Sequence, residues 1–160
     1  MGKVGNCQVA VTCVYADAQA FWPVGVRLYL PEEWTEDMDR WMKARVPPQE
    51  ARFRTKPAIA LEMLDKARRS EVPHACVVAD SGYGDNPNFL AGLEERQERY
   101  VVGVHWDFAV QWTREGPVDR VDEGLAARPR RDWRTITWRQ GSKGPLRKKF
   151  LAIRCWRVPR

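Results

Sequence analysis

The alternation of helix-forming and strand-forming segments between residues 55 and 104 most constrains the fold of this 160-residue chain. Thr55 can cap a helix that carries Pro57 in its first turn, and Pro73 ends it. The apolar residues of this segment recur at helical spacing: Ala60, Met63, Leu64 and Ala67. The segment is therefore expected to be an amphipathic helix packed on a core.

Residues 75–79 form a short, continuously apolar run that ends in Asp80, which predicts a central parallel strand. A loop is expected over residues 81–85. Asn86 and Pro87 then mark the start of a helix with an apolar face, and residues 100–104 form a second buried strand. The resulting α-β-α-β order predicts an α/β layer with a mixed sheet.

Two more strands are expected ahead of this layer. Residues 7–15 are apolar on both alternating sets and predict a strand buried on both faces, whereas residues 24–30 alternate as in a half-buried strand. The turn near 17–20 allows an antiparallel hairpin. Residues 35–54 are charged and contain two prolines, so they predict an irregular excursion with a short helix near 37–44.

Residues 107–132 predict a loop-rich connection. Residues 133–139 and 150–157 are β-prone and flank a Gly-Ser-Lys-Gly-Pro segment at 141–145, which predicts a long hairpin with a basic tip. Three tryptophans of this region can act as stacking platforms for bases or as the core of a small sheet. The core role is favoured for at least two of them: Trp133, Trp138 and Trp156.

Charge is segregated along the chain. Residues 128–160 carry twelve Lys and Arg and one acid, Asp132, whereas residues 1–127 carry 15 basic and 20 acidic side chains. A basic segment on a mildly acidic body favours a polyanion partner, and a solvated tail is the alternative. The candidate DNA-binding residues are those in and around the predicted hairpin tip: Arg139, Lys143, Arg147, Lys148 and Lys149.

No apolar run reaches the ~18 residues of a membrane-spanning helix, and the first residues lack the pattern of a signal peptide. The expected location is therefore the cytoplasm, with no membrane partner. The four cysteines and two histidines show no zinc-ligand spacing, so three or four of the cysteines are expected to be buried thiols.

Asp80 is the strongest single candidate for a functional residue, because open α/β sheets place their binding and active sites at the carboxyl ends of inner strands. Two roles stay open from the residues alone. Asp80 can cap the next loop by accepting from the amides of Gly82 or Tyr83, or it can bind a hard divalent cation such as Mg²⁺. Asp85 is expected to be a turn residue.

Other chemistry has weaker support in the sequence. Gly82 and Gly84 hint at a phosphate cradle, but the third glycine of a dinucleotide fingerprint is replaced by Pro87. His105 can serve as a base or have a structural role. Ser81 has no evident histidine partner for nucleophilic catalysis.

Four segments in order carry a family resemblance: GKVGNCQV at 2–9, RLYLPEEW at 27–34, FRTKP at 53–57 and VVADSGYGD at 77–85. Together they resemble bacterial insertion-sequence transposases, in particular the DDE superfamily endonuclease domain of actinobacterial elements. The region between Trp138 and Trp156 is similar to that family's β-rich insertion.

The resemblance implies an RNase H-like fold, a mixed sheet with flanking helices, whose three carboxylates hold two Mg²⁺ or Mn²⁺ ions for cutting and joining DNA at transposon ends. Asp80 matches the second of these carboxylates, so the resemblance favours its cation role. The implied domains are a partial catalytic core at 1–106, followed by a linker and basic hairpin insertion at 107–160.

The strand with the first Asp and the helix with the Glu are not found in this sequence. The expectation is a transposase fragment truncated at both ends and inactive alone, with an unpaired strand edge that allows self-association. The alternative is a non-catalytic DNA-binding remnant without sequence preference. A nucleotide-binding α/β domain is a third hypothesis.

Overall fold

A computed structural model of the chain describes residues 8–158. These residues belong to two compact units, Met1–Gly103 and Val104–Arg160, which are described separately. None of the helices among the described residues has the length and apolar character needed to span a bilayer.

The first unit begins with the expected antiparallel hairpin, formed by β1 (Val9–Ala16) and β2 (Phe21–Tyr29). Asp17 closes the turn, because its Oδ1 accepts from the backbone N–H groups of Gln19 and Ala20, both at 2.7 Å. These hydrogen bonds lower the pKa of the Asp17 carboxyl. Cys7, where the predicted strand starts, lies outside the described residues.

The excursion after the hairpin contains two short helices, α1 (Glu32–Glu36) and α2 (Met38–Lys43). It leads into α3 (Lys56–Arg69), the helix expected from the sequence. Thr55 caps α3, since its hydroxyl oxygen accepts from the N–H of Ala58 at 3.3 Å. Met63, Leu64 and Ala67 of the predicted apolar face are buried, Ala60 is partly buried, and Ile59, which the prediction did not include, is buried as well.

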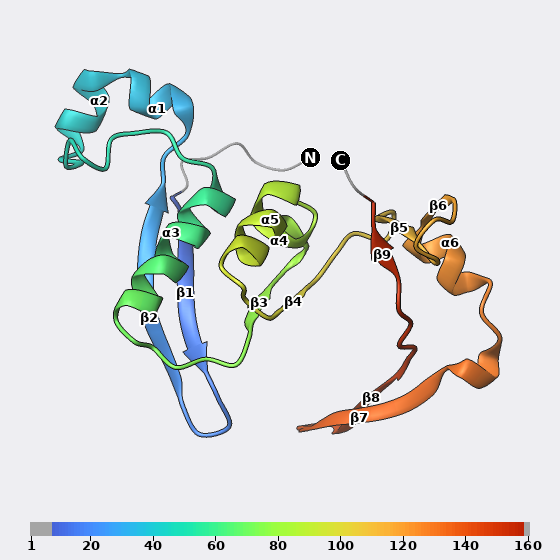
Figure 1. The fold of residues 1–160 in the computed structure, drawn as a ribbon. Coiled ribbons are helices and arrows are strands. Elements are labelled where there is room, and N and C mark those ends of the chain that lie inside the picture. Colours follow the sequence, from blue (N-terminus) through green and yellow to red (C-terminus); the bar gives the residue numbers. More distant parts are fainter. Residues whose placement is uncertain (1–7, 159–160) are drawn as a thin grey trace. The chain divides into compact units, whose positions relative to one another are not determined.

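The remainder of this unit follows the predicted order. It contains β3 (Val77–Ala79), α4 (Ser81–Gly84), α5 (Pro87–Glu95) and β4 (Tyr100–Val102). β3 and β4 pair in parallel, and the side chain of Asn86 caps α5 as expected. Helix α3 joins the two halves of this unit (Figure 1), because it packs against β1 through Ile59 and Met63 and against α5 through Leu64.

Two expectations about the sheet are wrong. The strands do not form one mixed sheet: the first unit holds two separate two-stranded sheets, β1-β2 and β3-β4. The strands are also not buried on both faces, because Val78 is 74% and Val101 64% exposed, and Val11 is the only buried residue of β1. Helices α3 and α5 cover one face, and no other described element of this unit covers the opposite one.

Residues 107–132 of the second unit were expected to be a loop-rich connection, but they contain regular helices and strands. Its three-stranded sheet has the order β6-β5-β9, and α6 follows β6 directly. The elements are β5 (Ala109–Gln111), β6 (Val118–Arg120), α6 (Val121–Ala126), the 3₁₀ helix η1 (Arg130–Asp132) and β9 (Trp156–Arg157).

The predicted basic hairpin is present as β7 (Arg134–Gly141) and β8 (Gly144–Phe150). Its second strand is not the expected one at 150–157: β8 ends at Phe150, and within 151–157 only Trp156 and Arg157 form a strand, β9, which pairs with β5. Gly141 pairs with Gly144, so only Ser142 and Lys143 form the turn, and Gly144 takes a φ of +112° that suits glycine. Pro145 is therefore a strand residue, which a two-stranded hairpin tolerates because both strands are edges.

Candidate metal site and nucleic-acid surface

Asp80 follows directly after β3, where the sequence predicted a site. β3 is fixed to its neighbour by hydrogen bonds from Val77 N–H to Arg99 O at 2.8 Å and from Gly103 N–H to Ala79 O at 2.9 Å. Asp80 itself is exposed, has an extended backbone conformation and is the N-cap residue of α4. The backbone next to Asp80 is therefore held in place by hydrogen bonds to the β4 segment.

The capping role of Asp80 is seen directly. Its Oδ1 accepts from the N–H of Gly82 at 3.0 Å, and its main-chain oxygen accepts from Tyr83 and Gly84 at 3.1 and 2.9 Å. The expected loop over 81–85 is therefore a one-turn helix. Because these three amides already have partners within the chain, they do not form an open phosphate cradle, and the nucleotide-binding hypothesis loses its basis.

Two glycines bring the residues after Asp80 close to the end of β4. A Cβ atom on Gly84 would lie 1.9 Å from the main-chain oxygen of Gly103, and a Cβ on Gly103 would lie 3.1 Å from the nitrogen of Ser81. Only residues without side chains allow this approach. The VVADSGYGD segment is thus a strand-to-helix turn that fixes Asp80 against the parallel pair.

Asp80 also borders a cavity of about 440 Å³ between β1, α3 and β3. Tyr83 lies in the same wall, and its pKa is raised by burial and by the negative charge of Asp80. Among residues 8–158, no group of three or more acidic, histidine or cysteine side chains could hold a metal ion. Asp80 is therefore not part of a cluster of three metal-binding side chains in the described part of the chain.

The sequence offered further polar candidates: Asp85, His105 and the cysteines. Asp85 occupies the C-cap position of α4, in agreement with its expected turn role. His105 belongs to the second unit. Cys76 and Cys155 are exposed and Cys13 is partly buried, so the expectation of buried thiols is wrong for Cys76 and Cys155.

A histidine that the sequence did not single out joins the end of α3 to β4. The ring of His74 contacts Glu98 through Nε2 at 2.9 Å and the main-chain oxygen of Val72 through Nδ1 at 3.1 Å. A carbonyl can only accept, so Nδ1 donates. These two hydrogen bonds raise the pKa of His74, with the bond to Val72 contributing most. The spacing of residues in one sequence cannot reveal the contact between His74 and Glu98, which are far apart along the chain.

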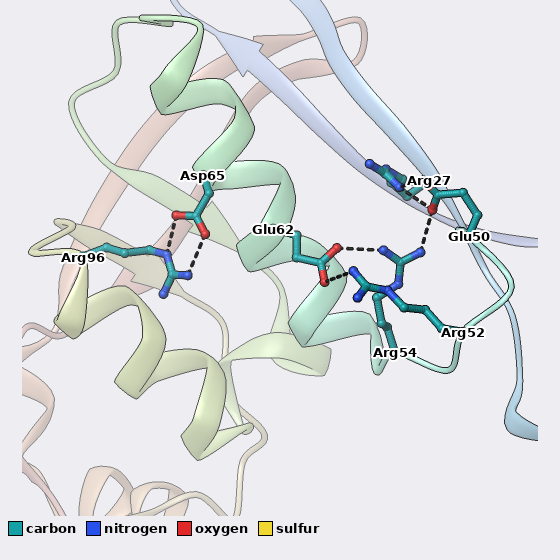
Figure 2. A network of polar contacts seen from close by, with 7 residues as sticks. All are labelled: Arg27, Glu50, Arg52, Arg54, Glu62, Asp65 and Arg96. Carbon is teal, nitrogen blue, oxygen red and sulfur yellow. Dashed lines mark hydrogen bonds and ion pairs between the residues drawn. The ribbon is translucent and has the colours of Figure 1, made fainter. Parts of the chain in front are cut away.

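The FRTKP segment supplies a second polar network, which Figure 2 shows beside α3. The Arg54 guanidinium contacts Glu50 at 2.7 Å and Glu62 at 2.8 Å, and Arg27 of β2 also pairs with Glu50. These partners, with the bond from Arg54 first, lower the pKa of Glu50. The network fastens the excursion to both the hairpin and α3, so this motif is structural in the first unit.

A bidentate pair joins α3 to α5 on the other side of α3 (Figure 2). The Nε and an Nη atom of Arg96 each donate to a separate carboxylate oxygen of Asp65 at 2.7 Å. This geometry lowers the pKa of Asp65, chiefly through the hydrogen bonds from Arg96.

The predicted DNA-binding residues all lie exposed on the β7–β8 hairpin. Arg147 and Lys149 pair across from Thr137 and Thr135 and share one face, whereas Lys148 points to the opposite face. Lys143 is in the two-residue turn. Residues 133–150 contain no acid, so nothing on the hairpin itself neutralises these cations.

The expectation that most of the three tryptophans form a core is wrong. Trp138 is 50% and Trp156 37% exposed. Trp138 packs edge-to-face on Phe150, with ring centroids 5.7 Å apart, on a hairpin that has no second layer among the described residues of its sheet. An aromatic pair with open surface beside Lys148 is suited to stacking on bases.

The comparisons with known proteins decide the family. A family model described as DDE superfamily endonuclease matches residues 1–145, a span that includes Asp80 and most of the hairpin. The chain belongs to the DDE superfamily endonuclease family. The resemblance to an insertion-sequence transposase is thereby confirmed, whereas its actinobacterial type stays a prediction.

One curated relative of this DDE superfamily endonuclease is similar over 112 residues with 29% identity: the "probable transposase for insertion sequence element IS701" of Microchaete diplosiphon. The match covers 69% of this chain and 26% of that protein, so the chain spans about a quarter of its length. No solved structure matches the chain.

Proposed function

We propose that this chain is part of the catalytic core of an insertion-sequence transposase with an RNase H-like fold, and that Asp80 is one of the carboxylates that hold divalent cations for cutting and joining DNA. The observation that carries the proposal is the family match over residues 1–145 together with an acid at the carboxyl end of a strand in a parallel pair.

The donor chemistry of Asp80 fits Mg²⁺ or Mn²⁺, which take hard oxygen ligands. An ionised carboxylate offers about four lone-pair sites, and the capping bond to Gly82 uses Oδ1. Bound cations of this kind polarise a phosphodiester and make a potent oxygen nucleophile available. The capping bond from Gly82 orients the carboxylate of Asp80 without any cation.

The same geometry supports inactivity of this polypeptide on its own. One carboxylate supplies too few ligands for two cations, and the described residues contain no cluster of three metal-binding side chains. We therefore propose that the remaining ligands come from outside these 160 residues. The first 106 residues would act as the core portion, and residues 107–160 as linker and hairpin insertion.

A nicking assay on supercoiled plasmid with Mg²⁺ or Mn²⁺ tests the proposed inactivity. The wild-type chain is expected to produce no more nicks than Asp80→Ala. Robust nicking that Asp80→Ala abolishes would show that the chain holds a complete site and would overturn this part of the proposal. Nicking that persists in both proteins at equal rates identifies a contaminating nuclease, because it does not depend on Asp80.

The second candidate function is sequence-independent DNA binding in the cytoplasm through the β7–β8 hairpin, and the exposed, acid-free set of cations favours it. The measurement is fluorescence anisotropy with duplex DNA between 50 and 200 mM salt. Affinity should fall steeply with salt, and Arg147→Ala with Lys149→Ala should weaken it and reduce the salt slope by about 2. Asp80→Asn is the matched control and should leave the affinity for DNA unchanged. Binding that does not depend on salt would contradict this function.

A further inference from the structure

The β7–β8 hairpin has two chemically different faces. Directly paired residues of an antiparallel ladder lie on the same face, and successive pairs lie on opposite faces. The pairs Thr135–Lys149 and Thr137–Arg147 therefore put polar side chains on one face. The other face, called the apolar hairpin face below, carries four apolar residues, of which the second reaches it from the bulge of β7: Ile136, Trp138, Leu146 and Phe150.

The apolar hairpin face is open in the described part of the chain. Its four apolar side chains are 43–50% exposed, and β7 and β8 form a sheet of their own within residues 8–158. A contiguous apolar patch of this kind is typical of a contact surface. Trp138 and Phe150 can stack on bases, but aliphatic Ile136 and Leu146 cannot, so the face as a whole fits a protein partner better than nucleic acid.

Cations on the apolar hairpin face define the charge of that partner. Three of them lie on this face, each paired across the ladder with one of its apolar residues: Arg134, Arg139 and Lys148. Residues 133–150 contain no acid. Packing two such hairpins against each other would bring the cations of both copies together, which is unfavourable. The partner surface is therefore expected to be apolar and acidic.

The excursion of the first unit offers this chemistry. Met38 and Met42 lie one turn apart on α2, so they share a face, and they are 60% and 58% exposed. Residues 32–39 carry five acids and no Lys or Arg. Helices α1 and α2 form a lobe beyond the end of β2 (Figure 1). Flexible methionine side chains adapt well to an irregular apolar partner such as the apolar hairpin face.

A second acidic stretch, at 107–123, is a poorer partner because its acids are already engaged within the second unit. Arg120 pairs with Asp122 at 3.0 Å and with Glu123 at 3.3 Å. The indole N–H of Trp112 donates to Asp119 at 2.8 Å. Charge complementarity therefore favours the α1–α2 lobe over this stretch as the partner of the hairpin cations.

We propose that the apolar hairpin face of one copy of this chain packs on Met38 and Met42 of a second copy, with the hairpin cations facing the acids of residues 32–39. Each copy carries both surfaces, so two reciprocal contacts can close a two-fold dimer. The surface that one hairpin offers is small, and the association is therefore expected to depend on protein concentration.

This inference goes beyond the proposed function. Arg147 and Lys149, which the DNA-binding proposal uses, lie on the opposite face of the hairpin, so the two contacts do not compete for the same side chains. The association also requires no cation at Asp80. A dimer of this kind would hold two copies of the chain together in the absence of DNA.

Sedimentation velocity of the full chain at several protein concentrations measures the association. A hairpin variant, Ile136→Asp with Leu146→Asp, and an α2 variant, Met38→Asp with Met42→Asp, should each weaken self-association about tenfold or more. Mixed in equal amounts, the two variants should associate at concentrations where each alone is monomeric. The reason is that the α2 variant keeps its hairpin face and the hairpin variant keeps its methionines.

Matched charge reversals guard against misfolding of the apolar variants, which circular dichroism would detect. Arg134→Glu with Lys148→Glu changes only exposed cations of the apolar hairpin face and should weaken self-association about fivefold. Arg147→Glu with Lys149→Glu makes the same change in net charge on the opposite face. This control should associate like wild type and lose affinity for DNA.

Three outcomes would overturn the proposal: a wild-type chain that stays monomeric, self-association that neither apolar variant weakens, or a mixture of the two variants that stays monomeric. Loss of DNA binding in the hairpin variant with unchanged self-association would also overturn it, because the apolar hairpin face would then be a nucleic-acid surface. Asp80→Asn should associate like wild type, so failure of the metal proposal can be told apart from failure of this one.

Discussion

At the scale of single residues, Asp80 shows that helix capping and cation binding are compatible roles for one carboxylate. Its hydrogen bond to Gly82 is the capping role that a strand-turn-helix sequence predicts, and the same bond orients the carboxylate at the end of β3. The sequence alone left capping and cation binding as alternatives. In the structure, the capping bond orients the carboxylate, which is compatible with the proposed cation role.

Gly84→Ala tests whether the close approach to β4 holds this turn. The added Cβ would lie 1.9 Å from Gly103 O, and because that oxygen is backbone the strands or α4 must shift. We expect a loss of about 2–3 kcal/mol in the free energy of unfolding, measured by urea titration. Gly82→Ala is the control, since its Cβ would meet only the movable Asp80 side chain at 3.2 Å. Equal stability of the two variants would contradict the account.

At the scale of elements, local signals were reliable wherever a side chain meets backbone nearby. Thr55 and Asn86 cap the helices that they were expected to cap, and Asp17 closes the hairpin turn. The start of β8 was missed because a Gly-x-x-Gly turn with positive φ at Gly144 is tighter than the loop that Pro145 suggested. The ion pairs of α3 were missed because their partners are far apart in sequence.

The pair between Asp65 and Arg96 should stabilise the packing of α3 on α5. Asp65→Asn is expected to cost about 1 kcal/mol of unfolding free energy, since the pair is bidentate but partly exposed. In a double-mutant cycle with Arg96→Gln, measured by urea titration, the coupling should be similar in size. Glu115→Gln, on an exposed turn of the second unit, should change little. A coupling of zero would show that the pair does not hold the helices together.

His74 should make stability depend on pH. Its pKa is raised in the folded chain by Val72 and Glu98, so its contribution is fully present below the ordinary histidine pKa of about 6.5 and is lost as pH rises through the raised value. The loss is expected to be about 0.2–1 kcal/mol. Urea unfolding between pH 5.5 and 9 should show it in wild type and in His105→Gln, but not in His74→Gln. An unchanged profile in His74→Gln would exclude this pair as the cause.

At the scale of the whole chain, the class of structure was predictable and the completeness of its sheets was not. The mixed α/β order and the parallel pairing of the two short strands followed from apolar runs separated by a helix. A β-branched run, however, says only that a strand can be covered on both faces. It cannot tell whether covering elements lie in the same chain, and Val78 and Val101 remain exposed here.

The site was predictable to the same extent. The motif around Asp80 predicted an acid at the carboxyl end of a strand, and Asp80 does follow β3, but sequence spacing could not show which other acids approach it. The tryptophans of the hairpin were misjudged for a related reason, since aromatic residues in alternation suggest a core only when a second layer exists. Both errors concern what surrounds an element and not the element itself.

The most direct measurement of the central claim is Mn²⁺-induced broadening of amide NMR signals in the ¹⁵N-labelled chain. A cation held by Asp80 should broaden the signals of Ser81, Gly82 and Gly103 at Mn²⁺ concentrations that leave the β7–β8 hairpin unaffected, and Asp80→Asn should abolish this effect while Asp85→Asn retains it. Uniform broadening, or the same pattern in Asp80→Asn, would contradict the assignment of Asp80 as a cation ligand.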